Sequence, residues 1–206
     1  MDAVSKEIRV AIPGIVQKWN AEEQTVEVEC AIKEKIYQDG SLVEVKIPLL
    51  VDLPIVFPTA GGYSFLAVPK KGDECLVVFA DMCIDGWYQS GGVQSQMDRR
   101  RHDLSDGFAI MGCWSQPNVK KKFPKEGCVL QNDNGTAGVS IKNGTLHVFG
   151  SASEECLLTN DAGSAGVSVK GGVVNIFGSV HINGRLYDSH QHSGVWSGGS
   201  NTGGVV

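Results

Sequence analysis

The sequence predicts an all-β protein with an N-terminal barrel and an elongated C-terminal part. Short apolar runs rich in β-branched residues recur along the chain and are separated by Gly, Pro and Asn. Segments with helical periodicity are scarce. Glycine contributes 26 of the 206 residues and is concentrated towards the C-terminus. Together these features are typical of many short strands joined by tight turns.

Residues 1–115 are predicted to form an OB-fold, because about five strands in roughly 100 residues suit a small closed barrel. A β-sandwich is the alternative. ECLVVFA (74–80) is almost continuously apolar and predicts a strand buried on both faces. TVEVECAI (25–32) alternates like a half-buried strand, with two sets of side chains on opposite faces: Val26, Val28 and Cys30 against Glu27 and Glu29.

Two polar segments follow these strands. MDRRRHDLSDG (97–107) is predicted to be a loop, in which His102 is a surface or bracing residue rather than a catalytic one. Residues 116–127 are expected to be a linker. Six cysteines lack CxxC spacing, so we expect small buried side chains rather than disulfides or zinc ligands: Cys30, Cys75, Cys83, Cys113, Cys128 and Cys156.

Charge and hydropathy exclude several classes of function. The net charge is −5 and the pI about 5.5, so no global field attracts nucleic acid or anionic lipid. No stretch approaches the ~18 apolar residues of a membrane span. The N-terminus lacks the features of a signal peptide, so the chain is expected to fold in a cytoplasm.

An internal repeat is the most informative feature. Residues 128–151 align without a gap on residues 156–179, and 14 of the 24 positions are identical. Within each copy the period is two, which places an apolar set on one face: Val139, Ile141, Leu146 and Val148, matched by Val167, Val169, Val174 and Ile176. The opposite face carries polar residues: Ser140, Lys142 and His147, matched by Ser168, Lys170 and Asn175. We expect stacked strand–turn–strand units, a β-helix or β-prism, over residues 128–187.

Two repeats cannot bury their own apolar face, since solenoids need about three or more. The simplest partner is another copy of the same chain, and a three-sided prism would close the core and remove strand edges. His147 and His181 are predicted to lie on the surface of this unit.

The last segment, residues 188–206, contains His190 and His192. Residues at i and i+2 of an extended strand point to the same side. If that side faces a threefold axis, six imidazoles meet, and an octahedral nitrogen shell suits Fe(II), Ni(II) or Co(II) better than zinc. The alternative is that an HxH in a glycine-rich tail is merely solvated.

HQHSGVWSGGSNTGG (190–204) resembles the tip of the central baseplate spike of contractile-tailed bacteriophages, the baseplate assembly protein V family. VFPTAGGYSFLAVPKKGDECLVVFAD, DGWYQSGG and RRRHDLSDGFAIMG look like the OB-fold domain of that family, and the repeats occupy the place of its trimeric β-helix. The chain departs from the family at its end, where Val205 and Val206 stand in place of a frequent proline.

The resemblance implies a mechanical, non-enzymatic function. It implies a homotrimer that docks on the baseplate hub and pierces the outer membrane of the host. The acidic charge balance counts against nucleic acid as a partner. It also implies that His190 and His192 bind one iron ion (Fe2+) per trimer, shared by three chains. The expected location is the virion, in the tail baseplate.

Other classes of function stay open from the sequence. A trimeric tail-fibre or adaptor protein would bind a receptor, although only a short segment follows the repeats. A non-haem iron enzyme would need two histidines and a carboxylate, for which Asp188 is the nearest candidate. A left-handed β-helix acyltransferase would need a hexapeptide period, whereas the repeat offset is 28 residues. An OB-fold can also bind oligonucleotides or sugars.

Overall fold

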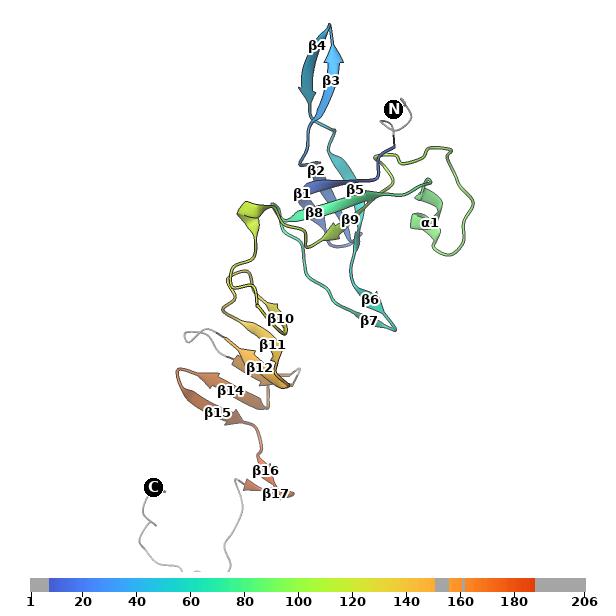
Figure 1. Cartoon of the computed structure of the whole chain (residues 1–206). Coiled ribbons are helices and arrows are strands. Elements are labelled where there is room, and N and C mark those ends of the chain that lie inside the picture. The colour runs from blue at the N-terminus through green and yellow to red at the C-terminus, as the bar shows by residue number, and fades with distance from the viewer. Residues whose placement is uncertain (1–7, 151–155, 161, 188–206) are drawn as a thin grey trace, which may run out of the picture. The chain divides into compact units, whose positions relative to one another are not determined.

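The computed structural model describes residues 8–150, 156–160 and 162–187, and the chain divides into two compact units, residues 1–119 and 120–206 (Figure 1). The helical elements of the described residues are α1 (Asp85–Ser90) and a 3-10 turn at Gln116–Asn118. The prediction of a mainly β protein is confirmed. None of these described helical segments is long and apolar enough to span a membrane.

Five strands close the barrel of the first unit: β1 (Ala11–Asn20), β2 (Thr25–Cys30), β5 (Leu50–Val56), β8 (Glu74–Phe79) and β9 (Gly107–Met111). Their order around the barrel is β1-β2-β5-β9-β8. Neighbours are antiparallel except β5 and β9, which are parallel. This is the strand order of an OB-fold. The predicted closed barrel is confirmed, and the sandwich alternative is wrong.

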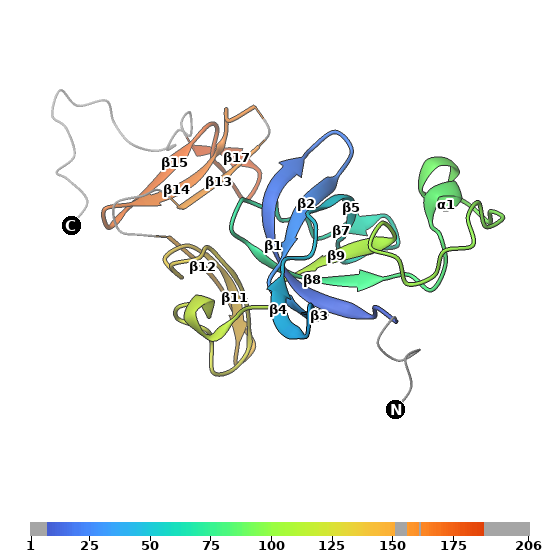
Figure 2. The same ribbon diagram turned by 90° about the horizontal axis from the view of Figure 1, so that it is seen from above.

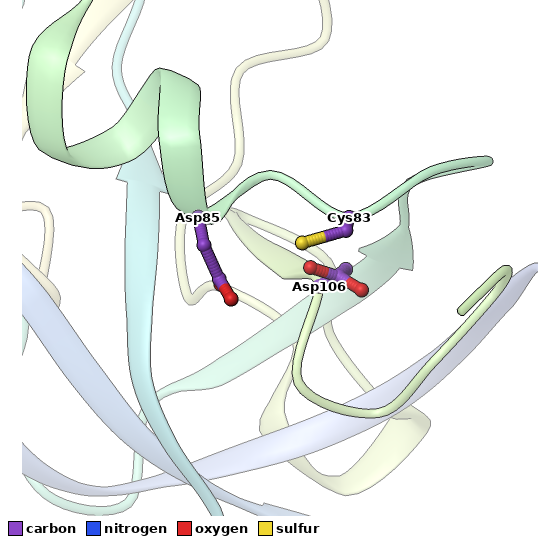
Figure 3. Close-up of side chains that lie close together, drawn as sticks. All are labelled: Cys83, Asp85 and Asp106. Atoms are coloured by element: carbon purple, nitrogen blue, oxygen red, sulfur yellow. The ribbon is translucent and has the colours of Figure 1, made fainter. Parts of the chain in front are cut away.

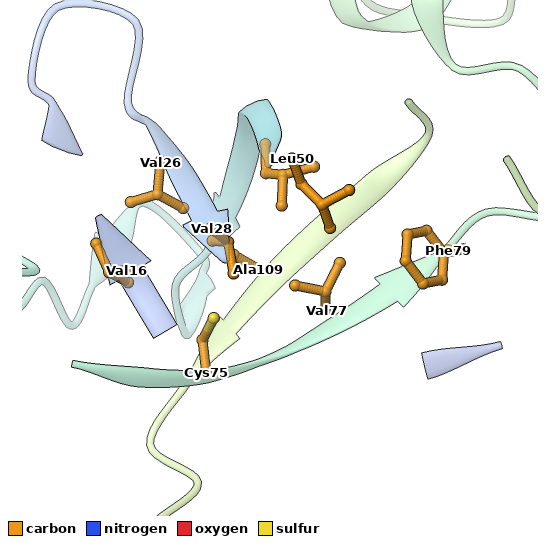
Figure 4. Close-up of a cluster of buried hydrophobic side chains, with 9 residues drawn as sticks. Val16, Val26, Val28, Leu50, Cys75, Val77, Phe79 and Ala109 are labelled. Carbon is orange, nitrogen blue, oxygen red and sulfur yellow. The ribbon is translucent and has the colours of Figure 1, made fainter. Parts of the chain in front are cut away.

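The barrel encloses one apolar core (Figure 4), made of Val16, Val26, Val28, Leu50, Leu53, Cys75, Val77, Phe79 and Ala109. The alternation predicted for β2 is confirmed, since Val26 and Val28 are buried and the glutamates between and beside them are partly exposed. The prediction that β8 is buried on both faces is wrong. Cys75, Val77 and Phe79 point inwards, whereas the residues between them are only half-buried, because the closed barrel covers one face of each strand.

Three insertions lie between consecutive strands of the barrel. The hairpin of β3 (Glu34–Gln38) and β4 (Ser41–Val45) follows β2, and the hairpin of β6 (Thr59–Ala60) and β7 (Tyr63–Ser64) follows β5. Helix α1 lies in the long connection between β8 and β9. Both hairpins extend away from the barrel in Figure 1, and Figure 2 shows α1 beside it. The sequence did not single out these elements.

The second unit contains two three-stranded antiparallel sheets and a short hairpin. The first sheet is β10 (Cys128–Gln131), β11 (Gly138–Lys142) and β12 (Thr145–Phe149). The second is β13 (Cys156–Thr159), β14 (Gly166–Lys170) and β15 (Val173–Phe177). The hairpin is β16 (His181–Ile182) and β17 (Arg185–Leu186). Each repeat therefore has three strands, one more than the expected strand–turn–strand unit.

The same asparagine closes the corner between the first two strands of each repeat. The side-chain oxygen of Asn132 accepts hydrogen bonds from the amides of Thr136 (2.8 Å) and Ala137 (3.3 Å). Asn160 does the same for the amides of Ser164 (2.9 Å) and Ala165 (3.3 Å). An asparagine side chain can replace a backbone partner in this way. The two corners therefore have the same hydrogen bonds because both copies have asparagine at this position.

Gly138 and Gly166 are the first residues of β11 and β14. A Cβ atom at either position would lie 2.2 Å from a carbonyl oxygen, that of Leu130 or Leu158. A ring carbon of Phe149 or Phe177 would also be within 3.0 Å of it. Glycine is needed here because backbone and ring approach too closely for a side chain.

Candidate functional site

The strand register gathers apolar side chains on one face of each repeat sheet. In the first sheet Val139 lies opposite Leu130 and Val148, and Ile141 lies opposite Leu146. The second sheet repeats this register position by position. The predicted sharing of faces is confirmed. We call this set the apolar ladder: Leu130, Val139, Ile141, Leu146, Val148, Leu158, Val167, Val169, Val174 and Ile176.

The apolar ladder faces solvent in the single chain. Its ten side chains are all exposed, from 37% for Val167 to 63% for Leu146 and Leu158. On the opposite face Ser168 is only 2% exposed. The other polar residues of that face, such as His147 and Lys170, are exposed, so both faces of these sheets are largely open to solvent. A contiguous apolar surface of this kind marks an interaction site.

The free energy available from covering this surface is substantial. Full burial of a Val, Leu or Ile side chain stabilises by about 1.5–3 kcal/mol. Covering the roughly half that is exposed would contribute about 1 kcal/mol each, on the order of 10 kcal/mol per chain for the ladder. This is comparable to the whole stability of a typical domain, so an uncovered ladder is a strong driving force for association.

The histidines predicted to lie on the surface of this unit do so. His147 and His181 are both exposed. His147 stands opposite Ser140 on the face away from the apolar ladder. His190 and His192, the predicted metal ligands, lie outside the described residues, as does the whole predicted tip at 188–206.

A second candidate site lies at one end of the barrel, where Cys83, Asp85 and Asp106 converge (Figure 3). One potential ligand atom from each lies within 4.8 Å of the others. Asp106 is fully buried, and one of its oxygens accepts a hydrogen bond from the amide of Ile84 at 2.9 Å. A thiolate and two carboxylates are a plausible set of metal donors by type alone.

Arg100 occupies this cluster and gives it a different role. Its Nε donates to Asp106 Oδ2 at 2.7 Å, and its Nη2 donates to Asp106 Oδ1 at 2.9 Å and to Asp85 Oδ1 at 2.7 Å. The hydrogen bond from Arg100 lowers the pKa of Asp85, and its bonds to Asp106 and Asp85 raise the pKa of Arg100. A cation placed between the carboxylates would have to displace the guanidinium.

We therefore describe Arg100, Asp85 and Asp106 as the arginine clamp. It fastens the 97–107 loop to the start of α1 and to the residue preceding β9. The sequence analysis placed Arg100 in a polar loop and missed this role. Arg100 is one of three consecutive arginines, and their spacing does not distinguish the one that pairs with the buried Asp106.

His102 braces the same loop, as predicted. Its Nε2 lies 3.3 Å from Asp81 Oδ1, and its backbone has a positive φ of 48°. Its Nδ1 is buried without a hydrogen-bond partner among the described residues. The contact with Asp81 supports the bracing role.

The described cysteines are free, but they are not uniformly buried. Cys75 lies in the barrel core, and burial raises the pKa of its thiol to about 12. Cys30 and Cys83 are half-buried, whereas Cys113 and Cys128 are exposed. The expectation of buried cysteines is wrong for the last two, because Cys113 follows the end of β9 and Cys128 begins an edge strand of an open sheet.

Comparison with known proteins bears mainly on the barrel. No curated protein matches the chain. Residues 12–112, which contain all five barrel strands and their three insertions apart from the first residue of β1, match the family model of the phage protein Gp138 N-terminal domain. This match supports the assignment of the chain as a phage protein with a structural, baseplate-related role.

Proposed function

We propose that the chain is the central spike of a contractile phage tail baseplate, a structural protein without enzymatic activity that pierces the outer membrane of the host. The observation that carries the proposal is the exposed apolar ladder. It is repeated in register in two sheets, and in the sequence it follows a barrel that matches a phage domain. The location that the match supports is the virion.

The apolar ladder supports assembly with copies of the same chain. Each repeat sheet is open, with edge strands β10 and β12 in one and β13 and β15 in the other. Open edges and an uncovered apolar face are both liabilities in a single chain. Three chains arranged around an axis would bury the ladders against one another and pair the edges. Such a shaft would resist shear, because peeling one chain away would break its contacts with both neighbours.

We further propose that His190 and His192 of three chains bind one iron ion at the tip. The support is the HxH spacing, the glycine-rich segment around it and the resemblance of that segment to known spike tips. Six protein nitrogens would fill the coordination shell and leave no position open for a substrate, so the role of the ion would be structural. The barrel end would dock on the baseplate hub.

Native mass spectrometry of the purified chain tests this proposal. Three chains of 22.0 kDa give 66.0 kDa, and one iron ion adds about 56 Da. The expected species is a trimer with one ion. A trimer without metal would leave the histidines solvated and favour the fibre or adaptor alternative. A monomer would overturn the proposal.

The double variant His190→Ala/His192→Ala separates the two parts of the proposal. It should lose the bound metal and keep the 66.0 kDa assembly, because the apolar ladder lies elsewhere in the chain. Exposed His147, changed to Ala, is the matched control and should retain the metal. A monomeric double variant would contradict the idea that the ladder drives assembly.

A further inference from the structure

The outer face of the barrel carries a second set of apolar side chains, on strands β1, β8, β9 and β5. Cys75 and Val77 of β8 point into the core (Figure 4), so the residues that alternate with them point outwards. Strand pairing arranges these outward side chains in two rows across the sheet. We call the seven residues of the two rows the outer patch: Ala11, Val78 and Phe108 in one row, and Pro13, Leu76, Ile110 and Val56 in the other.

The outer patch is only partly covered by the rest of the chain. Val56 is 43% exposed and Ile110 is 39% exposed, and the other patch residues of β8 and β9 are half-buried. The ring of Trp87, from helix α1, lies 5.8 Å from the ring of Phe108, measured between centroids. Trp87 is itself 48% exposed, so it extends the apolar surface beyond the strands.

The chemistry of the outer patch favours an apolar partner. All seven of its side chains are uncharged. The next outward residue of β8 is Glu74, whose carboxylate already accepts hydrogen bonds from the Ser115 hydroxyl (2.7 Å) and from the Asn118 side chain (2.8 Å). A charged ligand would meet no counter-charge within the patch, whereas another apolar protein surface would be complementary to it.

The size of the patch favours a partner that is already held nearby. An aromatic side chain buries about 150–250 Å², and the patch residues are partly covered, so the open area is on the order of 400 Å². A stable interface between independent proteins buries about 800 Å² on each partner. A tethered partner can bind through less, because linkage raises its effective concentration to about the millimolar range.

We propose that the outer patch is an interface between the barrels of neighbouring copies of this chain. The inference rests on the proposed function, in which the apolar ladders hold three chains together. Each barrel is covalently joined to a ladder, so assembly would bring three outer patches to high local concentration. Three copies of one patch can meet around a common axis. The contact would cover the second face of β8, which gives a physical reason for its almost continuously apolar sequence.

Photo-crosslinking of the full chain tests this interface. The photoreactive residue p-benzoylphenylalanine replaces Val56, at the edge of the outer patch. Irradiation of the assembled chain should give a crosslinked dimer of 44.0 kDa on a denaturing gel, since each chain is 22.0 kDa. Mass spectrometry should place the other end of the crosslink in the barrel of the second copy. The same substitution at Val51, exposed on β5 but outside the patch, is the matched control and should give at least about tenfold less dimer.

A charge in the outer patch gives a second readout. Val56→Asp should raise the concentration at which the trimer dissociates by at least about tenfold, because the contact would bury an unpaired carboxylate. Val51→Asp is the matched control and should leave that concentration unchanged. Sedimentation velocity over a dilution series measures both variants, and circular dichroism reports whether their barrels stay folded.

The outcomes separate this interface from the proposed function. An unsubstituted chain that stays monomeric would overturn both. A trimer without a dimer specific to position 56, or with crosslinks from position 56 only to the repeat unit of another copy, would overturn the interface alone. Unchanged dissociation of a folded Val56→Asp variant would also overturn the interface and leave the role of the ladder intact.

Discussion

The strands of the barrel and of the repeat unit alternate in the same way, but their apolar faces differ in exposure to solvent. In the barrel, alternating residues such as Val26 and Val77 are fully covered, because five strands close on themselves. In the repeat unit, alternating residues such as Ile141 and Val169 stay exposed, because each sheet has three strands and two open edges. The comparison teaches that alternation determines which face is apolar, whereas closure determines whether the chain can cover that face alone.

The sharpest way to break this comparison is to place the same charge in both regions. Val77→Asp should unfold the barrel, with a loss of about 4 kcal/mol or more, because an unpaired carboxylate enters a fully buried position. Thermal unfolding followed by circular dichroism measures this effect. A folded Val77→Asp barrel would mean that the core is less closed than its strand order indicates.

Val169→Asp places that charge in the apolar ladder instead. The chain should fold and fail to associate, since the position is exposed in the single chain and covered only in the proposed assembly. Sedimentation velocity measures the oligomeric state. Lys170→Asp, one residue further and on the opposite face, is the matched control and should stay assembled. An unchanged oligomer in Val169→Asp would show that assembly uses the other face.

Within the barrel, loss of the arginine clamp should have the next largest effect on stability, and it contrasts with loss of an exposed ion pair. Arg100→Ala leaves the buried carboxylate of Asp106 without its counter-charge and should cost about 3–5 kcal/mol of unfolding free energy. Urea denaturation monitored by tryptophan fluorescence measures it. Arg101→Ala, which removes an exposed pair with Asp81, should cost less than about 1 kcal/mol. Equal costs would refute the role of Arg100 as the counter-charge of the buried Asp106.

A glycine substitution tests whether the repeat sheets depend on close backbone approach. Gly166→Ala should destabilise the second repeat by about 1–3 kcal/mol, because its Cβ would lie 2.2 Å from the Leu158 carbonyl oxygen. Gly144→Asn should be tolerated, since this turn position is open and asparagine accepts its φ of 75°. Proteolysis of the repeat unit as a function of urea distinguishes the two variants.

Thiol modification tests the same comparison on the unsubstituted chain, and it should disturb the fold least. At pH 8 the thiol of Cys75 stays protonated, since its pKa is raised to about 12 by burial, and it should resist iodoacetamide until the barrel unfolds. The exposed Cys113 and Cys128 should be modified in the native chain. Peptide mapping by mass spectrometry identifies the modified sites. Early modification of Cys75 would indicate that the barrel opens readily.

The sequence predicted the parts of the fold that depend on period and repetition. The faces of β2 and the shared face of the apolar ladder follow from alternation at two residues, whereas the alternating burial of β8 was missed because its sequence is almost continuously apolar. The three insertions were missed. VEVKI (43–47) alternates like a half-buried strand, yet every residue of β4 is exposed, so alternation alone does not reveal a hairpin that lies outside the barrel. The clamp was missed because the partners of Arg100, Asp85 and Asp106, reach it only in the folded barrel.

The asparagine corners also bear on how such a chain changes over generations. Each repeat begins and ends in the same way, and its corner is closed by its own residue, Asn132 or Asn160. A duplicated copy of 28 residues would therefore bring its own corner and its own ladder residues. A deletion of one copy would remove both together, without disturbing the neighbouring copies. The length of the repeat unit would then change by one repeat at a time, and selection could act on the number of repeats.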